Sequence, residues 1–151
     1  MLKLLDLQTF TDERGSFTPF NHKIEEINWE QTNVVVNPKE GVFRGMHFQL
    51  NPVQRKLIKV IKGEIIDFVY NLETGECKQF VLKENDNKAL WVGYQWAHGY
   101  LVTQPDTIVV YLVEGNYNPK SERSIPYHQI QKVKTQVEKL YPNPILSDKD
   151  K

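Results

Sequence analysis

The stretch KLIKVIKGEIIDFVY, residues 56–70, holds the clearest structural signal in the sequence. Branched and aromatic residues recur with a period of two on both sides of Lys62-Gly63, a pair that suits a tight turn. The stretch therefore predicts two strands, Lys56–Ile61 and Glu64–Tyr70, joined as a hairpin.

Similar segments continue on both sides of this hairpin, separated by clusters of Gly, Pro, Asn and Asp. The further expected strands are Asn33–Val36, Val42–Gln49, Cys77–Lys83, Ala89–Val92, His98–Thr103 and Thr107–Val113. Eight short strands predict an all-β double sheet, and their spacing admits a sandwich, a barrel or a jelly roll.

The C-terminal part has a different period. Ile130, Val133, Val137 and Leu140 recur at helical spacing, and Tyr141-Pro142 interrupts the pattern. We therefore expect one amphipathic helix near the C-terminus, followed by a polar tail.

Length and composition narrow the class of protein. The chain has 151 residues, of which 40% are hydrophobic, so we expect a single domain over residues 1–151. Nineteen basic residues balance nineteen acidic ones, and this balance argues against nucleic acid or an anionic membrane as a partner. Cys77 is the only cysteine, which excludes an intrachain disulfide and fits a reducing compartment. Charges interrupt residues 1–6 too early for a signal peptide, so we expect a cytoplasmic protein.

Polar side chains interrupt the apolar strand GVFRGMHFQ, residues 41–49. One interpretation is that one face of this strand is simply exposed to water. Strict alternation would also place Arg44 and His47 on opposite faces. If both side chains face one pocket, Gly45 has to lie at a bulge or twist that redirects the chain.

Several motifs occur in a definite order along the chain. They are Asp12-Glu13-Arg14-Gly15-x-Phe17, Gln31-x-Asn33, Gly41–Gln49, Gln54-x-Lys56-Leu57, His98-Gly99-Tyr100, Tyr111, Tyr117-x-Pro119-x-x-Glu122 and Leu146–Asp150. As an ordered set covering nearly the whole chain, they resemble the dTDP-4-dehydrorhamnose 3,5-epimerases and their relatives that act on nucleotide-linked 4-keto sugars.

The resemblance implies a cupin-type jelly roll of antiparallel strands with a short C-terminal helix. It also implies a homodimer formed by exchange of N-terminal strands, a nucleotide-diphosphate 4-keto sugar as substrate, and no cofactor.

The resemblance further implies the roles of individual residues. His47 matches the general base that removes a proton beside the C4 ketone, and Asp150 matches its dyad partner. Tyr111 matches the acid on the opposite face, and Lys56 matches a lysine that stabilises the enolate. The positions that correspond to substrate or nucleotide contacts are Arg14, Gln31, Asn33, Arg44, His98, Glu122 and Lys149, with Tyr117 stacked on the base.

A catalytic metal is the main chemical alternative, because histidine is a common ligand in such barrels. A metal-binding cupin typically offers two histidines one residue apart with a carboxylate shortly after. Here Phe48 and Gln49 follow His47, and His22, His98 and His128 lie on other segments. We therefore expect no metal.

Three functions remain open at this point. The leading hypothesis is an epimerase that inverts C3, C5 or both of a nucleotide-linked 4-keto-6-deoxyhexose, with dTDP-4-dehydro-6-deoxy-D-glucose converted to dTDP-4-dehydro-L-rhamnose as the commonest family reaction. The alternatives are a cupin-type keto-isomerase and a non-catalytic sugar-nucleotide binding protein. The joint presence of base, acid, lysine and Asp150 favours an enzyme.

Overall fold

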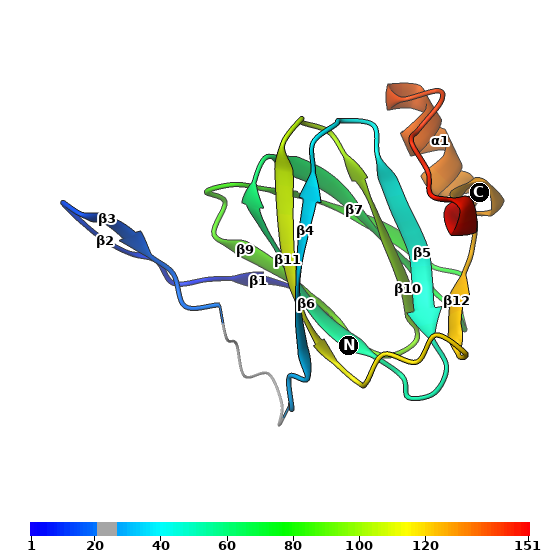
Figure 1. Ribbon diagram of the computed structural model, residues 1–151, viewed down its shortest axis with the longest axis horizontal. Helices are drawn as coiled ribbons and strands as arrows, with labels where there is room; N and C mark the ends of the chain where they lie inside the picture. Colours follow the sequence, from blue (N-terminus) through cyan, green and yellow to red (C-terminus); the bar gives the residue numbers. More distant parts are fainter. Residues whose placement is uncertain (21–26) are drawn as a thin grey trace.

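The computed structural model describes residues 1–20 and 27–151, and two five-stranded antiparallel sheets facing each other make up most of it (Figure 1). The first sheet has the order β1-β9-β6-β11-β4, formed by Leu2–Asp6, Lys88–Val92, Arg55–Lys62, Thr107–Glu114 and Gln31–Asn37. The second has the order β12-β5-β10-β7-β8, formed by Glu122–Ser124, Phe43–Gln49, Trp96–Val102, Glu64–Asn71 and Cys77–Lys83. The all-β double sheet predicted from the sequence is confirmed.

The tight turn at Lys62-Gly63 is confirmed, but the hairpin pairing is wrong. β6 ends at Lys62 and β7 begins at Glu64, with Gly63 at φ +79°. A Cβ at Gly63 would lie 2.1 Å from Thr107 Oγ1, so the corner needs glycine. The two strands nevertheless belong to different sheets: β6 pairs with β9 and β11, whereas β7 pairs with β8 and β10. The turn carries the chain from one sheet to the other.

Each of the eight predicted strands exists within a few residues of its predicted bounds, and the described residues form four further strands. Among the strands that the structure describes, β1 lies at the edge of the first sheet and pairs with β9 alone. β2 (Phe10–Asp12), β3 (Gly15–Phe17) and β12 have three residues each, too few to show a period. The β2–β3 hairpin projects away from the two sheets (Figure 1).

The predicted helix is α1, Gln131–Leu140, which lies on the outer face of the second sheet (Figure 1). Val133 and Val137 are fully buried against Phe43, Met46 and other side chains of that sheet. Burial of each valine stabilises the fold by about 1.5–3 kcal/mol. The helix ends before Tyr141, as predicted, but Leu140 is exposed rather than buried. A short 3-10 turn, η1 (Tyr127–Gln129), precedes the helix.

No helix within the described residues is long and apolar enough to cross a membrane.

The last residues are polar and mostly exposed, as predicted, but they do not form a free tail. Ile145 forms a parallel bridge with Val42, and its N–H donates to the Gly41 carbonyl at 2.8 Å. The chain then forms a second 3-10 turn, η2 (Asp148–Asp150), in which Asp150 is 2% exposed. These contacts hold the C-terminal segment beside β5 and bring the Asp150 carboxylate to the sheet.

The bulge required at Gly45 is confirmed. His47 pairs with His98 and Arg44 pairs with Tyr100, so a step of three residues on β5 matches a step of two on β10. Gly45 has φ +121°, a value that favours glycine, and a Cβ there would lie 2.5 Å from Gly99 Cα. The bulge places Arg44 and His47 on the same face of the sheet.

Candidate active site

A cavity of about 670 Å³ lies between the two sheets and receives side chains from both. The first sheet contributes Gln31, Asn33, Lys56 and Tyr111, and the second contributes Arg44, His47, His98, Tyr100 and Glu122. Tyr117, Lys149 and Asp150 complete the wall from segments outside the sheets. Every predicted site residue except Arg14 therefore lines one cavity.

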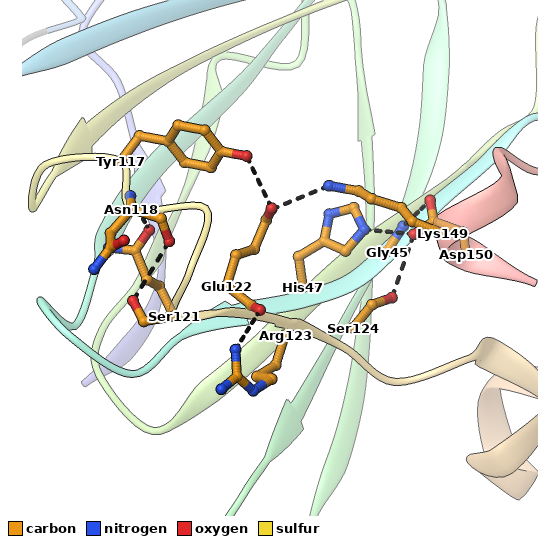
Figure 2. A network of polar contacts seen from close by, with 11 residues as sticks. Gly45, His47, Tyr117, Asn118, Ser121, Glu122, Arg123, Ser124, Lys149 and Asp150 are labelled. Atoms are coloured by element: carbon orange, nitrogen blue, oxygen red, sulfur yellow. Dashed lines mark hydrogen bonds and ion pairs between the residues drawn. The ribbon is translucent and has the colours of Figure 1, made fainter.

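His47 and Asp150 form a close pair on one side of the cavity (Figure 2). His47 Nε2 lies 2.5 Å from Asp150 Oδ1, and the Gly45 N–H donates to Asp150 Oδ2 at 3.2 Å. The Ser124 hydroxyl donates to the same carboxylate at 3.3 Å. Burial raises the pKa of Asp150, but the hydrogen bonds from His47 and Gly45 outweigh it and hold this pKa below its ordinary value. An ionised carboxylate in this position orients the imidazole ring.

Tyr111 approaches the cavity from β11 of the opposite sheet, and Asn33 on β4 is its cross-strand neighbour. Burial raises the pKa of Tyr111, although the nearby Arg44 cation acts in the other direction. The phenol therefore stays protonated at neutral pH and can donate a proton.

Lys56 lies on β6, also on the wall opposite His47. Burial lowers the pKa of Lys56, while the negative charges of Glu122 and Asp67 support its charged form. A cation that is partly removed from water interacts strongly with a negative charge that develops nearby.

Three side chains form a linked set at the entrance of the cavity. Glu122 accepts a hydrogen bond from the Tyr117 hydroxyl at 3.1 Å and another from Lys149 Nζ at 3.2 Å (Figure 2). Burial raises the pKa of Glu122, but the contacts with Lys149 and Tyr117 bring it below its ordinary value. The Tyr117 ring is 56% exposed, so one aromatic face is available where the cavity opens.

A second histidine–carboxylate pair, His98 and Asp67, was not predicted. His98 Nε2 lies 2.8 Å from Asp67 Oδ2, and Asp67 is fully buried. Burial raises the pKa of Asp67, and His98 opposes this shift. The signal was present in the sequence, because Asp67 interrupts the apolar strand Glu64–Asn71 and a buried acid requires a partner.

Arg14 lies at the turn of the projecting hairpin and not at the cavity. Its guanidinium pairs with Asp12, with Nη2 and Oδ2 2.5 Å apart, and its side chain is 86% exposed. Within one chain, this predicted contact residue is separate from the others.

No group of three or more His, Cys, Asp or Glu side chains with the geometry of a metal site occurs in residues 1–20 and 27–151. His22 lies outside the described residues.

The chain is similar in sequence and fold to one family of known proteins. The sequence model of the dTDP-4-dehydrorhamnose 3,5-epimerase family matches residues 2–151. The dTDP-4-dehydrorhamnose 3,5-epimerase of Shigella flexneri is 31% identical over 160 residues, covering 97% of this chain and 86% of that protein. The enzyme of the same name from Methanothermobacter thermautotrophicus is 31% identical over 134 residues, covering 82% of this chain and 72% of that protein.

Solved structures extend the comparison to the fold. The Bacillus anthracis dTDP-4-dehydrorhamnose 3,5-epimerase, solved with TDP and pyrophosphate bound, superposes with a TM-score of 0.86 at 31% identity and covers 99% of this chain and 90% of that one. A Legionella pneumophila 3,5-epimerase in complex with dTDP-4-keto-L-rhamnose gives 0.85 at 26% identity, covering 99% of this chain and 84% of that one. These matches confirm the cupin-type jelly roll. The chain belongs to the dTDP-4-dehydrorhamnose 3,5-epimerase family and is an isomerase.

Proposed function

We propose that this enzyme inverts C3, C5 or both of a nucleotide-linked 4-keto-6-deoxyhexose, and that its substrate is dTDP-4-dehydro-6-deoxy-D-glucose. One observation carries the proposal: His47 and Tyr111 reach the same cavity from opposite sheets. A base and an acid on opposite sides of a sugar ring are what inversion of a carbon requires. The TDP and dTDP-4-keto-L-rhamnose bound to the Bacillus and Legionella relatives support the choice of nucleotide and sugar.

The first step is removal of a proton beside the ketone. Neutral His47 takes the proton from the carbon next to C4, and the electrons of that C–H bond form a C=C bond while the ketone becomes an enolate. The ionised Asp150 stabilises the resulting imidazolium, and the Lys56 ammonium balances the charge on the enolate oxygen.

The second step returns a proton to the other face. The Tyr111 hydroxyl donates its proton to the same carbon, the ketone reforms, and a phenolate remains. Solvent then takes the proton from His47 and restores the one lost by Tyr111. The carbon is inverted, and its new hydrogen comes from solvent.

The remaining polar residues of the cavity bind and position the substrate in this proposal. Tyr117, exposed at the entrance, stacks on the nucleobase. Cations suit a diphosphate, and Arg44 and Lys149 supply them. The further polar contacts are those of Gln31, Asn33, His98 and Glu122.

We also propose that the enzyme is a homodimer in which the β2–β3 hairpin of one chain lies against the partner. Phe10 and Phe17 on this hairpin are 52% and 68% exposed, and such rings favour a contact that buries them. The outer face of the first sheet carries Val34 and Val36, which are 65% and 57% exposed. In the dimer, Arg14 would reach the cavity of the partner and supply the contact that is missing within one chain.

A cytoplasmic location fits the proposed enzyme, and the unpaired thiol of Cys77 supports it.

Proton NMR in deuterated water tests the proposed function directly. With dTDP-4-keto-6-deoxyglucose as substrate, the wild type should exchange the hydrogens at C3, C5 or both for deuterium and form the epimer. His47→Ala should lose both exchange and inversion, while His128→Ala, an exposed histidine outside the cavity, should keep both. Tyr111→Phe should keep exchange with retained configuration, because His47 can return a deuteron to the face from which it took a proton.

Two results would contradict the proposal. A ketone signal that moves away from C4 would identify a keto-isomerase. If the wild type exchanges no hydrogen of dTDP-, UDP- or GDP-linked 4-keto sugars, the remaining hypothesis is a non-catalytic sugar-nucleotide binding protein.

A further inference from the structure

Tyr100 lies in the middle of β10 and takes no part in the mechanism described above. It pairs with Arg44 on β5 and with Asp67 on β7, and its side chain lines the cavity. Only 3% of the residue is exposed, which makes it one of the most buried groups on the cavity wall.

The Tyr100 hydroxyl has no partner with full hydrogen-bond geometry among the described residues, although the Asn37 side chain lies close enough to act on its pKa. A buried hydroxyl without a partner costs free energy, and a phenylalanine would fill the same space without that cost. Such a group requires an explanation, and a ligand that bonds to it within the cavity is the simplest one.

The surroundings of the hydroxyl indicate the chemistry of the ligand group. Burial raises the pKa of Tyr100, so the phenol stays neutral and can both donate and accept a hydrogen bond. On one side, the Arg44 guanidinium is oriented by its Nε, which donates to Asn37 Oδ1 at 2.9 Å. On the other side is the buried Asp67 carboxylate. A neutral hydroxyl suits a position between a cation and an anion better than a phosphate does, because the phosphate would be repelled by the carboxylate.

The depth of Tyr100 indicates which end of the substrate it meets. Tyr117 marks the open end of the cavity, where its ring is 56% exposed, whereas Tyr100 is almost fully enclosed. If the nucleobase stacks on Tyr117, the sugar is the part that reaches the enclosed region.

We propose that the Tyr100 hydroxyl hydrogen-bonds a hydroxyl group of the sugar ring and thereby selects the sugar rather than the nucleotide. This inference rests on the proposed function, and it adds a specificity contact to the proton-transfer residues.

Calorimetric titration of the full-length enzyme with dTDP and with dTDP-glucose tests the inference. dTDP-glucose has a hydroxyl in place of the 4-ketone, so it binds without enolisation. Tyr100→Phe should bind dTDP-glucose about threefold to tenfold more weakly than the wild type, as expected for one lost neutral hydrogen bond, and should bind dTDP equally well.

Tyr127→Phe is the matched control. Tyr127 is also buried, but its hydroxyl donates to Glu138 Oε1 at 3.2 Å outside the cavity. This variant should bind both ligands as the wild type does and should have a lower Tm without ligand, because a hydrogen bond is lost. Tyr100→Phe should have an unchanged or higher Tm without ligand, because it removes an unpaired buried group.

Three results would overturn the inference. If Tyr100→Phe weakens the binding of dTDP and of dTDP-glucose equally, the hydroxyl contacts the nucleotide part. If the affinity for both ligands is unchanged, the hydroxyl contacts neither of them. If Tyr100→Phe has a lower Tm than the wild type, the hydroxyl has a structural role. Failure of the proposed function is a separate result, in which the wild type itself binds neither ligand and exchanges no hydrogen.

Discussion

Asp150 is a buried carboxylate that contacts three hydrogen-bonding groups, His47, Gly45 and Ser124. Its pKa in the folded protein lies below the ordinary value of 3.8. A carboxyl group of this kind binds protons less tightly in the folded state, so it stabilises the fold above its unfolded pKa. That stability is lost as the pH falls through the lowered folded pKa.

Asp150→Asn should therefore destabilise the protein in a pH-dependent way. At pH 7 we expect a loss of about 1.5–3 kcal/mol in the free energy of unfolding, and the difference from the wild type should narrow below about pH 4. Urea titrations at pH 7 and at pH 3 measure both values. The variant should also lower kcat by about a hundredfold, because its imidazole is no longer oriented by a carboxylate.

Asp148→Asn provides the control at the same end of the chain. The Asp148 side chain is fully exposed and pairs only with Lys151 among the described residues. We expect no measurable change in stability or kcat. A wild-type-like Asp150→Asn, or a loss that stays constant with pH, would contradict the assignment.

β5 is the element on which the site geometry depends, because its bulge turns Arg44 and His47 toward the same cavity. Gly45→Ala would introduce a Cβ 2.5 Å from Gly99 Cα and 2.7 Å from the His98 carbonyl oxygen, at a φ of +121°. We expect destabilisation by more than about 3 kcal/mol, since backbone strain and a backbone clash add together. Thermal unfolding measures the loss, and any folded fraction should have reduced kcat.

Gly75→Ala separates these two effects. Gly75 also has positive φ, +74°, but its nearest neighbour, Tyr70 Oη, would lie 3.6 Å from an added Cβ. This variant should lose only about 1 kcal/mol and should keep full activity. Similar losses of stability in both variants would show that the close approach of β10 to β5 is not the reason why position 45 requires glycine.

The strands show how far a sequence pattern determines the fold. The period-two segments predict all the strands of the two sheets except β1 and β12, because the apolar residues of these strands face a core. The pattern does not say which strands pair. It therefore predicts a hairpin at Lys62-Gly63, where the turn connects two different sheets. β12 is missed because three residues are too few for a period.

The candidate site was predicted mainly through resemblance, and its pairings come from long-range folding. His47 meets a carboxylate 103 positions away, and His98 meets one 31 positions away. No local pattern connects such residues, although Asp67 within an apolar strand did indicate a buried partner.

At the scale of the whole molecule, the projecting hairpin predicts a dimer. Light scattering should give twice the 17.7 kDa mass of one chain, and the double substitution of Phe10 and Phe17 by Ser should shift the protein toward the monomer. Val81→Ser, at a similarly exposed position on edge strand β8, should leave the dimer intact.

Arg14→Ala tests whether the hairpin also serves the site. We expect a dimer with a KM raised about tenfold and kcat nearly unchanged, because a contact with the substrate would be lost without effect on proton transfer. A monomeric wild type, or an Arg14→Ala variant with unchanged KM, would contradict this arrangement.

Because the base and the acid come from separate sheets, the distance between the sheets affects which reaction the enzyme catalyses. Facing sheets are held about 10 Å apart by the side chains between them, so the gap across which a sugar ring is protonated depends on the thickness of a hydrophobic layer. Val60 and Val109 belong to that layer and touch no reacting atom in the proposed mechanism. Changes in their volume would tilt one wall against the other and alter which ring carbon lies between donor and acceptor. Stereochemical outcome could then evolve through ordinary core substitutions while every proton-transfer group is retained.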